Sequence, residues 1–265
     1  MNSLKIKELT KINKKFFIII QARLGSSRFP EKILKKLDHR SVLDFLIENL
    51  LSIINNENII VATTKKSNDK KLIYLQKKYG IKIFFGSEKN VLRRYIEAAV
   101  KFSVTKIIRI TSDCPLVDLK VLSNMVKKFD KAKYDYISNN CILSGKRYPD
   151  GMDIEVFNLK SLKRSTKYCK LSSDYEHVTN VIWKSKKFRI GFFKPTKDLS
   201  HLRFSVDYAE DLKILRKMLK YIKYSKKKYC LKNYMNFFKL NPKLEKYMSN
   251  NLKKFYKNRP DLINR

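Results

Sequence analysis

Residues 17–32 join an apolar run to a cationic loop, and their types are suited to binding a ligand that carries phosphate. The run FIIIQ is rich in β-branched residues and predicts a buried strand. The loop after it contains one glycine and two serines, with Arg23 and Lys32 at its two ends as cationic donors for phosphate oxygens. A helical pattern follows, so we expect free backbone N–H groups where an anion can bind. The spacing fits neither a P-loop nor a dinucleotide site, and an ordinary strand–helix turn is the alternative interpretation.

Two aspartates follow predicted strands elsewhere in the chain, and their positions are suited to a bound Mg²⁺ ion. Asp113 lies in the segment ITSDCPL, and Asp207 ends the segment RFSVD. Carboxylates at strand ends near a phosphate loop can hold Mg²⁺, which prefers hard oxygen ligands and shares them with phosphates. Each aspartate also has a simpler interpretation, since Asp113 fits a turn and Asp207 fits a helix N-cap. Alternation places Arg203 and Ser205 on the same side of the second segment as Asp207.

The elements that position these residues alternate along the chain from residue 16 onward. Short apolar runs predict strands at 16–21, 58–63, 81–85, 106–111 and 134–137, and amphipathic stretches predict helices at 41–54, 68–79, 88–102 and 118–130. This alternation is typical of a three-layer α/β/α fold with a mainly parallel, Rossmann-like sheet. Such sheets bind ligands beyond the carboxyl ends of their strands, where the cationic loop and Asp113 are expected.

The pattern is less regular from residue 139 onward. It predicts strands at 153–157, 188–193 and 202–206, a helix at 159–170, and helices over the final 50 residues up to Pro260. Arg109 lies inside one of the earlier apolar strands, so it needs a buried anion or carbonyl groups. We expect a structural ion pair at that position.

The segment QARLGSSRFPEKIL resembles the nucleotide-binding signature of the cytidylyltransferases that activate acidic sugars. The family pattern A-R-x-x-S-x-R-x-P-x-K is met without a gap at Ala22, Arg23, Ser26, Arg28, Pro30 and Lys32. Six further blocks resemble the same family in order, at 59–64, 86–99, 107–118, 148–157, 174–182 and 203–212. The similarity is greatest to the spore-coat polysaccharide biosynthesis branch, followed by the 3-deoxy-manno-octulosonate and acylneuraminate cytidylyltransferases. It spans residues 16 to about 222.

This resemblance implies an enzyme that transfers CMP from CTP to a hydroxyl of an acidic sugar, such as an ulosonic or sialic-like acid. Pyrophosphate would be released, and the product would serve surface polysaccharide biosynthesis. The implied fold is that of nucleotide-diphospho-sugar transferases. The implied catalytic residues are Arg23, Lys32, Asp113 and Asp207, with Mg²⁺ held by the two aspartates. The residues implied to contact the nucleotide are Ala22, Arg23, Gly25, Ser26, Arg28, Lys32, Thr63 and Ser87.

Several of these assignments have alternatives. Arg28 is a phosphate candidate that is equally suited to a solvent-facing position in the loop. Thr63 at a strand end fits a purely structural role as well as a place near the nucleoside. Asn90 stands where the family pattern has an Asp, which leaves the preference among nucleotides open.

Candidates for binding the acceptor come from two blocks, DGMDIE and DYEH. Asp153 and Glu155 alternate onto one face of a predicted strand and are suited to binding sugar hydroxyls. Arg147 and Arg203 are candidates for pairing with a carboxylate of the acceptor. His177 is a candidate for orienting the substrate or acting as a base, although a histidine near a helix start is also commonly packed or capping.

We divide the chain into three parts on these grounds. Residues 1–15 are expected to be a flexible basic arm, and 16–222 a nucleotidyltransferase domain with an insertion at about 139–200 for acceptor binding or dimerisation. Residues 223–265 form a basic extension with many large apolar side chains, which a disordered arm would not contain. We expect its helices to pack on the domain or on a second copy in a homodimer, with weak contact to an anionic surface as the alternative.

The composition bears on partners and on location. The net charge of +36 comes from 47 Lys and 13 Arg against 24 acidic residues, and this lysine excess does not favour a specific nucleic-acid partner. No apolar run is long enough for a transmembrane segment or a signal peptide. Four scattered cysteines with no CxxC spacing favour reduced thiols, so we expect a cytoplasmic protein without structural zinc.

Two other functional classes compete with the cytidylyltransferase. A glycosyltransferase of related fold would consume a nucleotide-sugar, and it normally needs a DxD-type metal motif after a central strand. The chain has D-C-P at that point. A non-catalytic binding module would use the basic surface, but intact Arg23, Lys32, Asp113 and Asp207 argue against a decayed site.

Overall fold

The computed structural model describes residues 11–257, and these form one seven-stranded sheet. The order across the sheet is β3-β2-β1-β4-β6-β5-β7. The strands are β1 (Phe16–Gln21), β2 (Ile59–Thr64), β3 (Lys82–Gly86), β4 (Lys106–Thr111), β5 (Tyr136–Ser138), β6 (Glu155–Asn158) and β7 (Ile190–Phe192). β1, β2, β3 and β4 are mutually parallel, and only β6 runs antiparallel to its neighbours β4 and β5. The prediction of a mainly parallel α/β sheet is confirmed.

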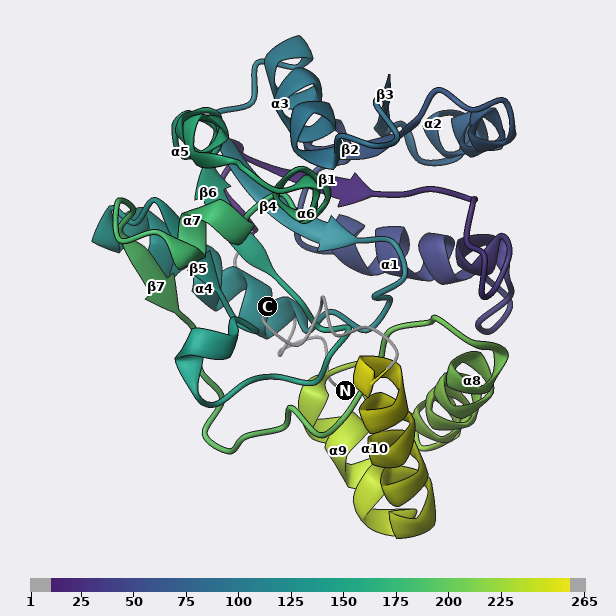
Figure 1. Cartoon of the computed structure of the whole chain (residues 1–265). Coiled ribbons are helices and arrows are strands. Elements are labelled where there is room, and N and C mark those ends of the chain that lie inside the picture. The colour runs from purple at the N-terminus through teal and green to yellow at the C-terminus, as the bar shows by residue number, and fades with distance from the viewer. Residues whose placement is uncertain (1–10, 258–265) are drawn as a thin grey trace.

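Helices follow most of the strands (Figure 1). They are α1 (Val42–Leu51), α2 (Tyr74–Tyr79), α3 (Val91–Lys101), α4 (Leu119–Ala132), α5 (Leu159–Ser165), α6 (Ser172–Glu176), α7 (Asn180–Lys184), α8 (Ala209–Tyr224), α9 (Leu231–Leu240) and α10 (Pro242–Lys257). Short 3₁₀ segments lie at Lys32–Leu34, Asn56–Asn58, Asn68–Ile73, Ile142–Ser144 and Thr166–Tyr168. The predicted helix at 68–79 therefore begins as a 3₁₀ segment, and the one predicted at 159–170 ends in one.

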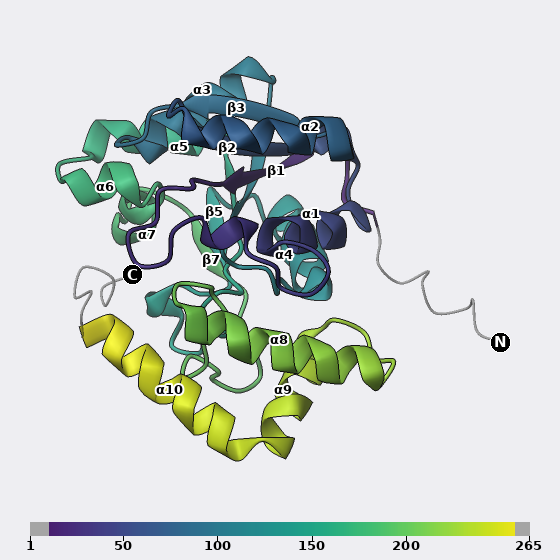
Figure 2. The ribbon, with the colours of Figure 1, turned by 90° about the vertical axis from the view of Figure 1, so that its right-hand side faces the viewer.

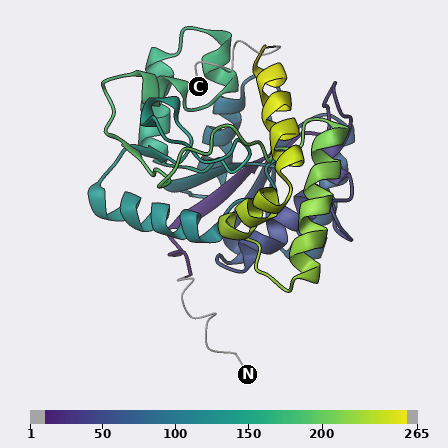
Figure 3. The ribbon, with the colours of Figure 1, turned by 90° about the horizontal axis from the view of Figure 1, so that it is seen from below.

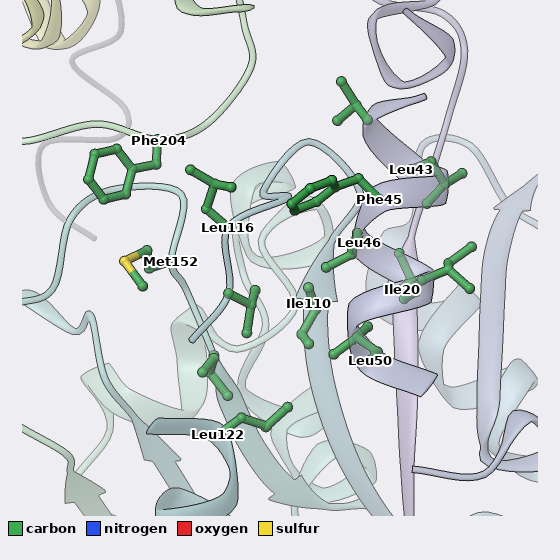
Figure 4. Packing of buried hydrophobic residues seen from close by; sticks show 14 of the residues in the cluster. Ile20, Leu43, Phe45, Leu46, Leu50, Ile110, Leu116, Leu122, Met152 and Phe204 are labelled. Carbon is green, nitrogen blue, oxygen red and sulfur yellow. The ribbon is translucent and has the colours of Figure 1, made fainter. Parts of the chain in front are cut away.

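Both faces of the sheet are covered, which gives the three predicted layers. In β1, Ile18 and Ile20 point into the core shared with α1 and α4, whereas Ile19 points into the core shared with α3. All three side chains are completely buried, as expected for a central parallel strand. Figure 4 shows Leu46 and Leu50 of α1 beside Ile20 and Ile110 of the sheet.

The strand predicted at 202–206 is an extended segment outside the sheet. It forms one parallel bridge, between Arg203 and Asp150. Its backbone N–H groups instead bond to loops, with Phe204 donating to the Asp150 carbonyl at 2.6 Å and Val206 to the Asp113 carbonyl at 2.9 Å. The predicted alternation holds, because Leu202, Phe204 and Val206 are fully buried. A side chain at Gly151 (φ +87°) would collide with the backbone of this segment, so glycine is required there.

The two ends of the chain differ in how far the structure describes them. Of the arm predicted at 1–15, residues 1–10 lie outside the described residues, while Ile12 is buried and donates its N–H to the Ile53 carbonyl at 2.9 Å. Residues 258–265 of the predicted extension also lie outside them. In the described part, no helix is both long and apolar enough to cross a membrane.

The C-terminal extension packs on the domain. Helices α8, α9 and α10 lie together in Figures 2 and 3, on one side of the molecule. The Phe238 ring of α9 stacks on Phe204 with centroids 5.8 Å apart. The Tyr234 ring packs edge-on against Phe204, with centroids 5.9 Å apart. Phe238 is completely buried, so the extension joins the core through the extended segment that ends at Asp207.

Replacing Phe238 with alanine should lower the free energy of unfolding by about 3–5 kcal/mol, because it removes a buried aromatic ring and leaves a cavity. Leu240→Ala is the control on the same helix, since Leu240 is 66% exposed and should change stability by less than about 0.5 kcal/mol. Urea denaturation of the full chain measures both. Equal stability of the two variants would mean that α9 is not part of the cooperatively folded body.

Candidate active site

A cavity of about 560 Å³ lies at the carboxyl edge of the parallel strands. Residues at the ends of β1, β4 and β5 line it, together with Ser205, Asp207 and the last turns of α10. Figure 1 shows β1 and β4 ending side by side at this edge. Open α/β sheets bind their ligands at such edges, so this cavity is the candidate active site.

The loop after β1 is held in place by backbone bonds and by one buried carboxylate. Asp69 accepts a hydrogen bond from the N–H of Leu24 at 2.8 Å and another from the hydroxyl of Thr64. Glu31 adopts a left-handed backbone conformation (φ 52°), and Lys32, which follows it, is buried. No motif in the sequence identifies Asp69, because its role arises only when the loops after β1 and β2 meet.

This loop presents groups that can bind an anion. Within residues 11–257, the backbone N–H groups of Gly25 and Ser27 have no hydrogen-bond acceptor, and the exposed Arg23 has no ion-pair partner. A Cβ added at Gly25 would meet no atom within 4 Å, so the glycine leaves open space beside the loop. The predicted nucleotide contacts that line the cavity are Arg23, Gly25, Ser26, Arg28 and Lys32.

Lys32 joins the two predicted metal-binding aspartates. Its ammonium Nζ lies 2.6 Å from Asp113 Oδ2 and 2.8 Å from Asp207 Oδ1. Arg28 also donates to Asp207 Oδ1, at 3.0 Å. Asp113 comes directly after β4, and Asp207 ends the extended segment that bonds to the Asp113 carbonyl through Val206. The structure therefore brings the predicted catalytic residues Lys32, Asp113 and Asp207 into direct contact.

The charges in this cluster stabilise one another. Burial would lower the pKa of the Lys32 ammonium, but Asp113 and Asp207 outweigh it, so its pKa is raised. Burial would likewise raise the pKa of the Asp207 carboxyl, but Lys32 and Arg203 hold that pKa far below its ordinary value. All three groups of the Lys32–Asp207–Arg203 contact thus remain charged at neutral pH.

Arg203 holds this cluster in place through buried ion pairs. Its side chain is only 1% exposed, and its guanidinium pairs with Asp207, with Asp150 at 3.3 Å and with Asp211 at 3.6 Å. Asp211 also accepts the N–H groups of Asp207 and Tyr208 at 2.8 Å each, at the start of α8. The sequence analysis gave Arg203 as a candidate for pairing with a carboxylate of the acceptor. Arg203 does not line the cavity, and its guanidinium contacts carboxylates of neighbouring residues instead.

The residues expected near the nucleoside are not part of the cavity wall. Ala22 and Thr63 are buried, Ser87 is half-buried, and none of the three lines the cavity. In the described part of the chain the Thr63 hydroxyl has no hydrogen-bond partner. Asn90 is the N-cap of α3, accepting the Arg93 N–H at 2.7 Å, a role that Asp fills equally well.

The predicted acceptor residues Asp153 and Glu155 both line the cavity but differ in their partners. Asp153 accepts the N–H of Gly151 and the side-chain amide of Asn140, each at 2.8 Å. Glu155 pairs with Arg109, which is the structural ion pair expected for that arginine. Its other oxygen accepts the hydroxyls of Tyr136 and Thr179 at 2.6 Å each. The carboxylate of Glu155 is therefore fully engaged within the protein.

His177 and Arg147 both line the cavity. His177 is 6% exposed, and its backbone carbonyl accepts the Thr179 N–H at 2.6 Å. Arg147 is held through its backbone by Asp198, and its guanidinium has no ion pair with any residue of the described part. The guanidinium of Arg147 is thus available to an anion bound in the cavity.

Several lining residues were not predicted from the sequence. They include Tyr136, Thr179 and Trp183, as well as Phe255 and Tyr256 of α10. Their positions depend on where helices dock, and a motif reports only on residues close together in the chain.

The two aspartates fit a Mg²⁺ ion in the chemistry of their donors. One oxygen of each lies within 2.8 Å of the same ammonium nitrogen, so both already converge on one cation. Within residues 11–257 there is no group of three or more His, Cys, Asp or Glu side chains that could hold a metal ion. Proteins commonly supply two carboxylates to Mg²⁺, and phosphate oxygens and water are then its other ligands.

Comparisons with known proteins give one consistent result. A family model described as cytidylyltransferase matches residues 17–254. The chain is 31% identical to the spore coat polysaccharide biosynthesis protein SpsF of Bacillus subtilis, over 75% of this chain and 83% of SpsF. It is similar in structure to a cytidylyltransferase of Leptospira borgpetersenii, with a TM-score of 0.78, 31% identity, and coverage of 87% of this chain and 96% of that one.

A more distant neighbour shares the fold. This is CMP:2-keto-3-deoxy-manno-octonic acid synthetase complexed with CTP, with a TM-score of 0.56 and 14% identity. The match covers 78% of this chain and 99% of that one. The predicted nucleotide-diphospho-sugar transferase type of fold agrees with these neighbours.

Replacing Glu155 with glutamine should make stability less dependent on pH. Burial would raise the pKa of Glu155, but Arg109, Thr179 and Tyr136 outweigh it and lower the pKa. The wild-type carboxylate therefore stabilises the fold above about pH 4.3, the ordinary glutamate value, and this contribution is lost as the pH falls through the lowered pKa. We expect the variant to be about 3–5 kcal/mol less stable at pH 7, because Arg109 is left buried without its anion, and the difference to narrow below pH 4.

Urea denaturation between pH 3 and pH 7 measures this difference. Glu97→Gln is the control, since Glu97 pairs with Arg93 on the surface and should show little change at any pH. A stability difference for Glu155→Gln that stays constant across this range would contradict the buried ion pair.

Proposed function

The chain belongs to the cytidylyltransferase family, as its motifs predicted, and on this premise we propose that it transfers CMP from CTP to a hydroxyl of an anionic sugar acceptor. The observation that carries the proposal is the convergence of Lys32, Asp113 and Asp207 beside a loop with backbone N–H groups that have no acceptor among the described residues. Cationic donors and convergent carboxylates in one cavity are what a metal–triphosphate complex requires. The product would serve the synthesis of a surface polysaccharide, a role that the name of the SpsF relative supports.

The triphosphate would bind along the loop after β1. The N–H groups of Gly25 and Ser27 would donate to phosphate oxygens, and Arg23 and Arg28 would pair with them from the cavity wall. Lys32 would neutralise the negative charge that develops on the β- and γ-phosphates. Its ammonium already faces the cavity, where it lies between two carboxylates. CTP as the nucleotide is supported by the family and by the CTP-bound neighbour of the same fold.

Asp113 and Asp207 would hold Mg²⁺ on the phosphates. The ion, when bound, supplies positive charge that stabilises the transition state at the α-phosphorus and the leaving pyrophosphate. The contribution of the chain is to orient the two carboxylates toward one point and, through the pairing of Asp207 with Arg203, to keep Asp207 ionised.

The reaction would be an in-line displacement. An acceptor hydroxyl forms a bond to the α-phosphorus while the bond to the β-phosphate oxygen breaks, and pyrophosphate leaves. The proton of the hydroxyl passes to a base, for which His177 on the acceptor side is our candidate. Positioning and charge stabilisation would supply most of the rate, as is usual in phosphoryl chemistry.

The acceptor would lie on the side of Arg147 and Asp153. Arg147, which has no ion pair within residues 11–257, offers its guanidinium to an acidic group, and Asp153 offers carboxylate oxygens to hydroxyls. Glu155 would contribute by holding the wall formed with Tyr136 and Thr179.

All four cysteines are free thiols, which supports the expectation of a reducing, cytoplasmic compartment.

The chain should bind CTP in the presence of Mg²⁺ more tightly than ATP, GTP or UTP. Calorimetric titration of the four nucleotides measures this preference, and a pyrophosphate-release assay with a panel of ulosonic and sialic acids identifies the acceptor. Equal affinity for the four, or binding of a nucleotide-sugar without pyrophosphate release from CTP, would overturn the proposal and favour the glycosyltransferase class.

Asp113→Asn should reduce turnover by roughly a hundredfold or more, because the metal's charge stabilisation is worth several kcal/mol. The substitution keeps the volume of the side chain and removes its charge. Asp130→Asn is the control, since Asp130 is 45% exposed and pairs with Lys106 away from the cavity. If Asp113→Asn keeps more than about a tenth of the wild-type rate, Asp113 is a turn residue and not a metal ligand.

A further inference from the structure

The last described helix reaches the charged cluster of the site. Phe255 of α10 lines the cavity and is only 7% exposed. Its ring centroid lies 4.1 Å from the Arg203 guanidinium carbon and 5.6 Å from that of Arg28. The family match ends at residue 254, so the resemblance does not account for this contact.

The register of α10 is fixed by the side chains that precede Phe255 on the same face. Leu252 and Met248 are buried, with 4% and 3% exposure, and they lie one and two turns before Phe255, respectively. At the other end of this face, Glu245 lies 3.3 Å from His201, just before the extended segment. The ring of Phe255 is therefore held in place by the docking of the whole helix.

The ring covers the ion pair that orients Asp207. Arg203 takes Asp207 Oδ2, which leaves Oδ1 for Lys32 and Arg28. A guanidinium under an aromatic face is attracted by the ring and loses contact with water, and an ion pair is stronger where water is excluded. Tyr208 lies farther from the same guanidinium, at 5.7 Å, so Phe255 is its nearest aromatic cover among the described residues.

We propose that Phe255 is a positioning residue that shields Arg203 and, through it, keeps Asp207 Oδ1 turned toward the bound nucleotide. The inference rests on the proposed function for its consequence, since Asp207 is the carboxylate expected to serve the metal–triphosphate complex. The C-terminal extension then contributes to the function of the site as well as to the stability of the fold.

The first test measures shielding in the protein without any ligand. Phe255→Ala should speed hydrogen exchange of the Arg203 Nε–H, followed by ¹⁵N NMR of the full chain, by at least tenfold. Phe255→Tyr keeps an aromatic ring and should exchange like the wild type. Tyr247→Ala is the matched control, because Tyr247 is an aromatic on the same helix that is 44% exposed. Unchanged exchange in Phe255→Ala overturns the inference, whatever the fate of the proposed function.

The second test measures the consequence for the nucleotide. With Mg²⁺ present, Phe255→Ala should bind CTP at least tenfold more weakly than wild type, while Phe255→Tyr and Tyr247→Ala bind normally. Faster exchange with unchanged CTP affinity would show that Asp207 does not depend on the ring and would overturn the positioning role. Failure of the wild type to bind CTP would overturn the proposed function, and the exchange result would still decide whether Phe255 shields Arg203.

Discussion

The ionic contact of Lys32 with Asp113 and Asp207 is the interaction on which the arrangement of the site depends. The three groups come from the loop after β1, the end of β4 and an extended segment nearly a hundred residues later, and they meet at hydrogen-bond distance. Each is costly to remove from water alone, and each is tolerated because the others are present. A displacement of any one segment would leave a buried charge without its partner, so the contact fixes how the segments join.

The extended segment at 203–207 connects this chemistry to the packing of the chain. Its apolar side chains are fully buried, and Phe204 stacks on Phe238 of the C-terminal extension. Its polar side chains face the charged cluster, where Arg203 is held by carboxylates on one side and by the ring of Phe255 on the other. The same five residues therefore transmit the docking of α9 and α10 to the carboxylate of Asp207.

The sequence predicted most of the scaffold because local periodicity reports on burial. β1 to β4 read as strands since their side chains are buried on alternating faces of one sheet, and much of the loop that carries the motif at 22–32 lines the cavity. Alternation also placed Arg203, Ser205 and Asp207 on one side, but periodicity does not say what that side meets. Arg203 was therefore assigned to an acceptor when it meets three carboxylates, and Glu155 was assigned without its partner Arg109. Phe255 could not be predicted, because its position follows from the docking of a helix distant in the chain.

The ammonium of Lys32 has a consequence for the order in which this protein matures. Lys32 pairs with both facing carboxylates, and Arg28 and Arg203 pair with Asp207, so the chain supplies its own cations where these segments meet. A nucleotide that arrives with its metal would substitute one cation for another and draw the freed ammonium toward its phosphates. Under the proposed function, loading with nucleotide and metal would then be an exchange of cations at a site whose segments are already joined.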